Sequence, residues 1–259
     1  MNNALESAPG MGMGILGARG ITRNFGDYPA LRGIDLDIYQ GECVVCAGAN
    51  GSGKTVLSRI LCGLAAPSSG VVYFKGTPLA ECSGLRTHIG LVFQDPDAQF
   101  VGETVYEDVA FGPRNLCFPP EKVHSAVSGV LKKIGLDAKA DWTPRSLSGG
   151  EKRRLAIGGI LAMGCRVLFM DEPFANLDWT SVRMVLEIIK TLKQDGVTLV
   201  ILTHELEKVL AFADRLLILD NGLLADGGNC EDVLDRLTDR RGVRDPRRSV
   251  KTAADCTWL

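Results

Sequence analysis

The eight residues GANGSGKT at positions 48–55 constrain the fold of this chain more than any other stretch of its sequence. They match the pattern G-x-x-x-x-G-K-[S/T] at every fixed position, and they lie between a dense apolar run, CVVCA, and a segment with helical spacing. Glycines allow backbone N–H groups to turn toward phosphate oxygens, and the start of the helix contributes its positive end. We therefore expect a strand, a nucleotide phosphate site and a helix, in that order.

Two residues of this loop have expected roles of their own. Lys54 would reach the β- and γ-phosphates of the nucleotide, and the Thr55 hydroxyl would ligate Mg²⁺. The other expected nucleotide contacts are the remaining loop residues, Gly48, Ala49, Asn50, Gly51, Ser52 and Gly53.

A pair of acidic residues ends the apolar run VLFMDE at 167–172. Asp171 closes a predicted buried strand, where it would lie beside Mg²⁺ and contact it through a water molecule. Glu172 is the next residue and projects differently, so it is placed to orient or deprotonate an attacking water. The sequence thus predicts a magnesium site and a general base at one strand end.

Two polar residues follow other predicted strands. Gln94 ends the segment HIGLVFQ at 88–94, and His204 follows the segment at 197–202. Parallel strands deliver ligand groups at their carboxyl ends. We therefore expect Gln94 to contact the metal and the attacking water, and His204 to contact the γ-phosphate. Taken alone, each residue is explained equally well as a polar cap of its strand.

The order of the predicted elements indicates the fold class. Apolar and polar residues alternate in ILGARGITRNF and ALRGIDLDIYQGE, as in a half-exposed sheet. A predicted helix at about 53–65 follows the loop, and helices at 180–193 and 205–213 alternate with strands at 197–202 and 215–220, as in a parallel α/β sheet. Between these parts, the stretch from 95 to 165 carries helical apolar spacing alone, which predicts a helical block inserted in an α/β core.

Composition limits the classes of partner. The chain has 259 residues, a formal net charge of −2 and 46% hydrophobic residues, so it can build a core and does not resemble a dedicated nucleic-acid binder. No run approaches the ~18 apolar residues of a membrane span, and the N-terminus lacks the pattern of a signal peptide. Any membrane role is therefore expected to come through a partner. Basic residues at 239–251 predict a solvated tail rather than a phosphate site.

Cys43 and Cys46 form a C-x-x-C motif, a spacing found in zinc and redox sites. On a strand, an odd offset places the two side chains on opposite faces of the sheet. We therefore expect two buried thiols that behave as small apolar residues.

The stretch LSGGE at 147–151 predicts a second anion cradle, at the start of a helix in the helical block. Ser148, Gly149 and Gly150 would present N–H donors to a phosphate. A single nucleotide site has no need of two cradles. We therefore expect two chains to pack so that each phosphate loop faces the Ser-Gly-Gly of the other chain.

Taken in order, GANGSGKT, Gln94, LSGGE, VLFMDEP, ANLD and His204 resemble the motifs of ATP-binding-cassette (ABC) ATPases over about residues 15–230. The resemblance implies a P-loop NTPase α/β fold with a RecA-like core, an antiparallel β subdomain and an inserted helical subdomain. It also implies that Phe25, or less readily Tyr28, stacks on adenine, and that Asp178 lies at the dimer interface. The expected boundaries are an extension at 1–13, an ATPase domain at 14–238 with its helical subdomain at about 95–165, and a tail at 239–259.

A narrower resemblance concerns residues 92–116, VFQDPDAQFVGETVYEDVAFGPRNL, which are similar to the corresponding segment of energy-coupling-factor importers of vitamins or transition-metal ions. It implies a groove for a transmembrane coupling subunit, which works with a substrate-binding membrane subunit. Asp95 and Asp97 either meet arginines there or are solvated acids. Pro113, in FGP, predicts a helix end. Cys117 stands where the resemblance has a glycine.

The expected function is therefore ATP hydrolysis that powers such an importer, at the cytoplasmic face of the membrane. The working pair would be two copies of this chain or one copy and a homologous ATPase. A non-transport ABC ATPase acting on nucleic acid or ribosomes is the alternative, although the chain lacks a long coiled-coil insert and a second cassette. A P-loop kinase or GTPase is disfavoured, because no N-K-x-D motif is present and LSGGE would have no purpose.

Overall fold

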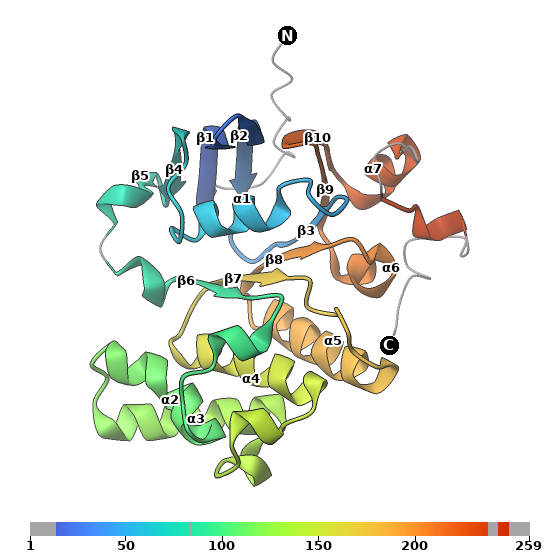
Figure 1. Ribbon diagram of the computed structural model, residues 1–259. Coiled ribbons are helices and arrows are strands. Elements are labelled where there is room, and N and C mark those ends of the chain that lie inside the picture. The colour runs from blue at the N-terminus through green and yellow to red at the C-terminus, as the bar shows by residue number, and fades with distance from the viewer. Residues whose placement is uncertain (1–13, 83, 238–242, 249–259) are drawn as a thin grey trace.

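The structure is a computed structural model that describes residues 14–82, 84–237 and 243–248. Its centre is a six-stranded sheet with the strand order β10-β9-β3-β8-β7-β6 (Figure 1). The strands are β3 (Cys43–Ala47), β6 (Ile89–Val92), β7 (Val167–Asp171), β8 (Thr198–Thr203), β9 (Arg215–Asp220) and β10 (Leu223–Gly228). All neighbouring strands run parallel except β9 and β10. The predicted α/β core is confirmed.

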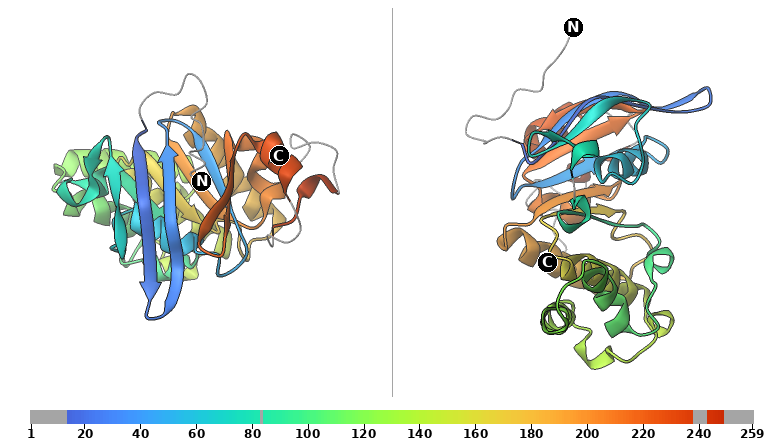
Figure 2. Two further views of the ribbon diagram at one scale, coloured as in Figure 1. Left: turned by 90° about the horizontal axis from the view of Figure 1, so that it is seen from above. Right: turned by 90° about the vertical axis from the view of Figure 1, so that its left-hand side faces the viewer.

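A second, antiparallel sheet lies over one face of this core. Its order is β2-β1-β4-β5, with β1 (Leu16–Phe25), β2 (Tyr28–Ile38), β4 (Ser69–Phe74) and β5 (Thr77–Pro78). Helix α1 (Lys54–Leu61) packs between the two sheets, whereas the helical block lies beyond the opposite face of the parallel sheet (Figure 2). The molecule is therefore layered as antiparallel sheet, helix, parallel sheet and helices.

Residues on β3 contribute to both faces of the parallel sheet. Cys43 and Val45 belong to the hydrophobic cluster on the side of the helical block, while Val44 and Cys46 belong to the cluster around α1. The two cysteines therefore point in opposite directions, as the odd offset predicts. Burial raises the pKa of both thiols to about 12. Within the described part of the chain, no group of three or more His, Cys, Asp or Glu residues is arranged to hold a metal ion.

The inserted block consists of α2 (Val105–Asn115), α3 (Pro120–Ile134) and α4 (Gly149–Ala162). The prediction that FGP ends a helix is wrong, because α2 continues through Pro113 to Asn115. Proline disfavours a helical residue before it through a clash with the Cβ of that residue, and Gly112 has no Cβ. Cys117 follows α2 with a φ of 56°, the left-handed conformation that glycine adopts most easily. The glycine expected there thus corresponds to a real feature of the backbone.

Several predicted boundaries differ from the structure. Helix α1 ends at Leu61, and β6 ends at Val92, two residues before Gln94. The predicted helix at 205–213 is a short α6 (Leu206–Val209) followed by a 3-10 turn. Helix α5 (Trp179–Gln194) agrees with prediction, whereas β10 and α7 (Cys230–Arg236) were not predicted.

Part of the basic tail packs against the domain. Val243 is buried, and Arg247 forms an ion pair with Asp235 on α7 at 2.7 Å. The prediction of a solvated tail is therefore wrong for Val243 and Arg247, whereas Arg244 is exposed. The expected extension at 1–13 and most of the expected tail, including 249–259, lie outside the described residues. No helix in the described part of the chain has the length and apolar character needed to cross a membrane.

Candidate active site

The phosphate loop joins β3 to α1, as the sequence predicts. Gly51 and Gly53 have φ angles of 83° and 106°, which residues with side chains rarely adopt. A Cβ on Gly48 would lie 2.3 Å from the Leu219 carbonyl oxygen, so the loop passes too close to β9 for any side chain there. The buried Ser52 hydroxyl has no hydrogen-bond partner within the described residues. The loop is thus shaped around an open polar surface, with Ala49 and Asn50 at its outer edge.

Lys54 is held at the centre of the loop. Its ammonium group donates to the carbonyl oxygens of Gly48 at 2.7 Å and Ala49 at 3.2 Å, and it lies 3.6 Å from Glu172 Oε1. The side chain is 6% exposed. A buried ammonium must be paired or hydrogen-bonded, and here backbone carbonyls and one carboxylate satisfy it. The same cation is available for phosphate oxygens that enter the loop.

Asp171 is the last residue of β7 and is buried, with its Oδ1 lacking any hydrogen-bond partner in the described chain. Burial raises the pKa of this carboxyl, and a hydrogen bond from the Thr55 hydroxyl opposes the rise. An orphaned carboxylate oxygen beside a hydroxyl is the donor set that a hard divalent cation uses. The residues therefore fit the expected Mg²⁺, with Asp171 and Thr55 as ligands.

Glu172 is held in a strained backbone conformation by its neighbours on β8. Its φ of 45° costs about 1–2 kcal/mol for a residue with a side chain, and its N–H donates to the Leu202 carbonyl oxygen at 2.8 Å. The Thr203 hydroxyl donates to Glu172 Oε2 at 3.0 Å, and His204 Nδ1 lies 3.0 Å from Oε1. Strain that the surroundings hold in place is common at functional sites.

Thr203 was missed in the sequence, although a signal was present. It is the last residue of β8 and immediately precedes His204, so the strand alternation that exposes His204 turns Thr203 inward. Its hydroxyl also accepts from the Glu205 N–H at 3.0 Å, which fixes the direction of its own proton toward Glu172.

The predicted adenine contact lies apart from this cluster, at the turn that joins β1 to β2. Phe25 and Tyr28 face each other across the turn, and their side chains are 53% and 60% exposed. The Arg23 guanidinium lies 4.9 Å from the centre of the Phe25 ring. Both rings keep an open face, so stacking on adenine stays a prediction for Phe25, with Tyr28 as the alternative.

The Ser-Gly-Gly cradle starts α4 in the helical block, on the face of the sheet opposite α1 (Figure 1). Ser148 caps this helix: its hydroxyl accepts from the Glu151 N–H, and Glu151 accepts from the Ser148 N–H. A Cβ on Gly149 would fit without a clash, because its nearest neighbour would be Leu177 Cδ2 at 3.9 Å. A Cβ on Gly150 would lie 2.2 Å from Ser181 Oγ, so α5 requires that glycine for packing.

Asp178 caps α5 beside this cradle. Its carboxylate accepts from the Ser181 N–H at 2.7 Å, and the same serine packs on Gly150. The structure therefore joins Ser148, Gly150 and Asp178 in one region and Lys54, Asp171, Glu172 and His204 in another. Gln94 lies between them: its side chain is exposed, and its carbonyl oxygen accepts from Arg153 on α4 at 2.7 Å.

Comparison with known proteins identifies this arrangement. A family model described as ABC transporter matches residues 31–175. The chain belongs to the ABC transporter family. The energy-coupling factor transporter ATP-binding protein EcfA of Methanosarcina acetivorans is 42% identical over 222 residues, which cover 84% of this chain and 81% of that protein. The resemblance to energy-coupling-factor proteins, first noted in residues 92–116, is thereby confirmed over most of the chain.

Solved structures of ABC proteins share the fold. One is cbiO1 from Clostridium perfringens, described as part of the ABC transporter complex cbiONQ, with a TM-score of 0.79, 32% identity and coverage of 92% of this chain and 96% of that one. Another is the ATP-binding cassette MJ0796, solved as a dimer bound to ADP and Pi, with a TM-score of 0.74, 27% identity and coverage of 83% and 98%. This ABC chain is therefore an ATPase with an ATP-binding site.

We predict that Asp171→Asn does not destabilise the ligand-free chain but removes its stabilisation by Mg²⁺ and ATP. The native pKa of Asp171 is raised above its unfolded value, so ionisation of this carboxyl lowers the free energy of unfolding as pH rises past 3.8. Asparagine avoids that cost and cannot serve as an anionic ligand. Thermal unfolding at neutral pH, with and without Mg²⁺ and ATP, measures both effects.

The exposed Asp141 provides the control, because Asp141→Asn should leave both unfolding temperatures unchanged. A marked loss of ligand-free stability in Asp171→Asn would contradict this account of the buried carboxyl.

Proposed function

We propose that this chain is the ATP-hydrolysing subunit of an energy-coupling-factor-type ABC importer, which powers uptake of a vitamin or a transition-metal ion through a membrane partner. The observation that carries the proposal is the meeting of Lys54, Asp171, Glu172 and His204 at the carboxyl ends of β3, β7 and β8. A second cradle lies across the sheet, where it serves a nucleotide held by another chain.

Glu172 is the proposed general base. Its carboxylate is fixed from both sides by the Thr203 hydroxyl and His204 Nδ1, so its direction is set before substrate enters. A fixed base gains its advantage from orientation, because no rotation must be frozen in the transition state. His204 is half exposed, and its free edge is proposed to face the γ-phosphate.

Charge stabilisation is the larger part of phosphoryl transfer. Lys54 and the loop N–H groups are proposed to bind the β- and γ-phosphates. Mg²⁺, when held by Thr55, Asp171 and Gln94, supplies further positive charge to those oxygens. ATP entry would replace the carbonyl contacts of Lys54 with phosphate contacts of opposite charge, which are stronger.

The second half of each site is proposed to come from a neighbouring chain, either a second copy or a homologous ATPase. Ser148 and Gly149 are exposed at the start of α4, and Asp178 is exposed at the start of α5. The exposed start of α4 offers N–H donors that attract phosphate, whereas the Asp178 carboxylate already accepts from the N–H of Ser181. ATP binding would thus close the pair, and hydrolysis would reopen it.

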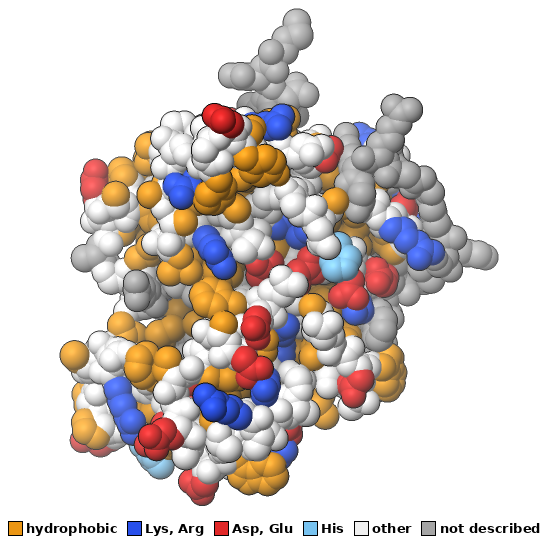
Figure 3. Space-filling view, in the orientation of Figure 1, with side chains coloured by type: hydrophobic (Ala, Val, Ile, Leu, Met, Phe, Trp, Pro, Cys, Tyr) orange, Lys and Arg blue, Asp and Glu red, His pale blue; other side chains and the backbone are white. Residues whose placement is uncertain are grey.

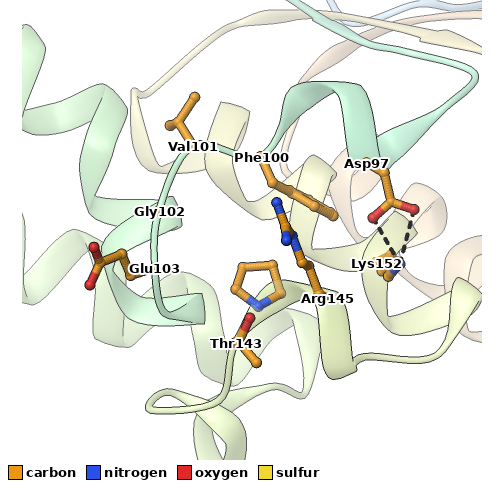
Figure 4. A pocket seen from close by; sticks show the side chains of 9 residues that line it. Asp97, Phe100, Val101, Gly102, Glu103, Thr143, Arg145 and Lys152 are labelled. Atoms are coloured by element: carbon orange, nitrogen blue, oxygen red, sulfur yellow. Dashed lines mark hydrogen bonds and ion pairs between the residues drawn. The ribbon is translucent and has the colours of Figure 1, made fainter.

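A groove beside the helical block is the proposed docking site of the transmembrane coupling subunit (Figure 4). It has a volume of about 820 Å³ and is lined by Asp97, Phe100, Val101, Gly102, Glu103, Thr143, Pro144, Arg145 and Lys152. Asp97 and Lys152 form an ion pair at 2.8 Å at one end, and Glu103 lies at the other. Between these ends, the Arg145 side chain lies beside Phe100. A partner that offers apolar side chains to Phe100 and Val101 and an acidic group to Arg145 fits this lining, and the chain would then lie at the cytoplasmic face of the membrane.

Figure 3, which has the orientation of Figure 1, shows acidic and basic side chains interspersed across the visible face of the described chain. A nucleic-acid surface is expected to be predominantly basic. This distribution supports the transport function over the non-transport alternative.

We expect Glu172→Gln to lower kcat by about a hundredfold or more while ATP still binds, because an amide cannot accept the proton of the attacking water. ATP-dependent pairing should then persist, since the bound nucleotide is not consumed. Phosphate release and sedimentation with ATP measure the two effects. Glu187→Gln, an exposed change on α5, is the control, and full turnover by Glu172→Gln would exclude the base assignment.

Ser148→Asp and Ser148→Asn test the second cradle as a matched pair. Both side chains cap α4, but only aspartate adds a negative charge where the partner's phosphate is proposed to lie. We expect Ser148→Asp to lose ATP-dependent pairing and hydrolysis, while Ser148→Asn keeps most of both. ATP binding to the single chain should be unchanged in both variants. Equal hydrolysis by the two variants would contradict the shared site.

The membrane partner is tested by purifying the tagged chain from its native membranes in mild detergent. Membrane subunits should accompany the wild-type chain but not Arg145→Glu, which reverses a charge in the groove. Arg32→Glu, an exposed change on β2, should keep those subunits. Their absence from the wild-type preparation, or their retention by Arg145→Glu, would count against this docking site.

A further inference from the structure

Three consecutive basic residues follow the Ser-Gly-Gly cradle on α4, and each holds a different part of the chain. Lys152 pairs with Asp97 at 2.8 Å. Arg153 donates to the carbonyl oxygens of Phe93 at 2.6 Å and Gln94 at 2.7 Å. Arg154 donates to the carbonyl oxygens of Ile134 and Gly135, at the end of α3. The first two therefore hold the segment after β6, whereas the third acts within the helical block.

The Arg153 contact is buried and directional. Its side chain is 2% exposed, and its two terminal nitrogens bind the carbonyls of consecutive residues. The buried Nε of Arg153 has no hydrogen-bond partner within the described residues, so these two bonds are the ones that offset the cost of burying the guanidinium. A planar fork that binds two fixed acceptors permits little sliding. Arg153 therefore sets the distance and angle between α4 and the Gln94 backbone.

The rest of the segment 93–102 is also attached to the helical block. The Asp108 carboxylate on α2 accepts from the N–H groups of Val101 and Gly102, at 2.8 and 3.0 Å. Within the segment, the Gln99 side chain accepts from the Phe93 N–H at 3.1 Å. The segment 93–102 is thus bound to the helical block at both ends, to α4 through Arg153 and to α2 through Asp108, although it begins directly after β6 in the parallel sheet.

We propose that Arg153 is a positioning residue that makes Gln94 move with α4. The helix carries Ser148 and Gly149, which serve the nucleotide of the neighbouring chain, and Gln94 serves the nucleotide of its own chain. A displacement of α4 when the pair closes is transmitted through Arg153 to the Gln94 backbone. The half-site on α4 and the half-site that contains Gln94 then change position together. This inference rests on the proposed function, because it takes Gln94 as a ligand of the nucleotide site.

The first test measures the attachment without any activity. Amide hydrogen exchange of the full-length chain is compared between Arg153→Met and Arg154→Met, which lose matched hydrogen bonds to two carbonyls each. Exchange across 93–102 should rise by about tenfold or more in Arg153→Met alone, because the segment opens locally. In Arg154→Met the rise should lie at 131–136. Unchanged exchange at 93–102 in Arg153→Met overturns the proposal.

The second test measures whether Arg153 acts through Gln94. Arg153→Met should lower kcat by about tenfold or more with little change in ATP affinity, since a small misplacement of a reacting group is costly. In a Gln94→Ala background the same substitution should have almost no further effect on kcat. Independent, multiplying effects of the two changes would show that Arg153 does not act through Gln94.

Arg153→Lys covers the case in which Arg153→Met fails to fold. Lysine keeps the charge but cannot bind both carbonyls in one plane, so it should reproduce the exchange and kcat changes in weaker form. Wild-type behaviour of Arg153→Lys in both measurements overturns the proposal. If Gln94→Ala alone leaves kcat unchanged, the assignment of Gln94 in the proposed function fails, whereas the exchange result still decides the attachment of Arg153.

Discussion

The parallel register of β3, β8 and β7 is the constraint on which the site depends. Ala47 pairs with Thr203, and Asp171 pairs with Leu202, so three strands end together at one edge of the sheet. One more residue on each strand then supplies the phosphate loop, the strained Glu172 and His204. Buried strands with apolar side chains on both faces hold this register firmly, because a slip by one residue would turn every side chain to the other face.

Close approach of backbones is the second condition of the site. The loop passes within contact of β9 at Gly48, and α4 passes within contact of α5 at Gly150. Neither approach tolerates a side chain. The motif glycines are therefore needed for two reasons. Gly51 is needed for its φ angle, Gly48 and Gly150 are needed for space, and Gly53 is needed for both, because its Cβ would lie 2.8 Å from the Ala30 carbonyl oxygen.

The parts of the fold that could be predicted are those with a local signal. The phosphate loop, Asp171 and Glu172 follow from motif and strand end, and the helical block follows from apolar spacing. The inward direction of Thr203 had a local signal in the strand alternation, but its partner Glu172 lies 31 residues away in sequence. Arg153 had no local signal, because its acceptors lie 59 or more residues away. The helix end predicted from Pro113 was wrong because the preceding residue is a glycine, which has no Cβ to clash with the proline ring, so α2 continues to Asn115. The packing of Val243 depends likewise on a distant surface.

The cysteines have a practical consequence for observing motion. Cys43 and Cys46 are buried and stay protonated at neutral pH, so they react slowly with thiol reagents. Among the cysteines in the described part of the chain, Cys117 alone is exposed, and it lies between α2 and α3. A fluorophore or spin label attached to Cys117 would move with the helical block. A second label on the β1–β2 turn would then give a label-to-label distance that reports movement of the helical block relative to the antiparallel sheet.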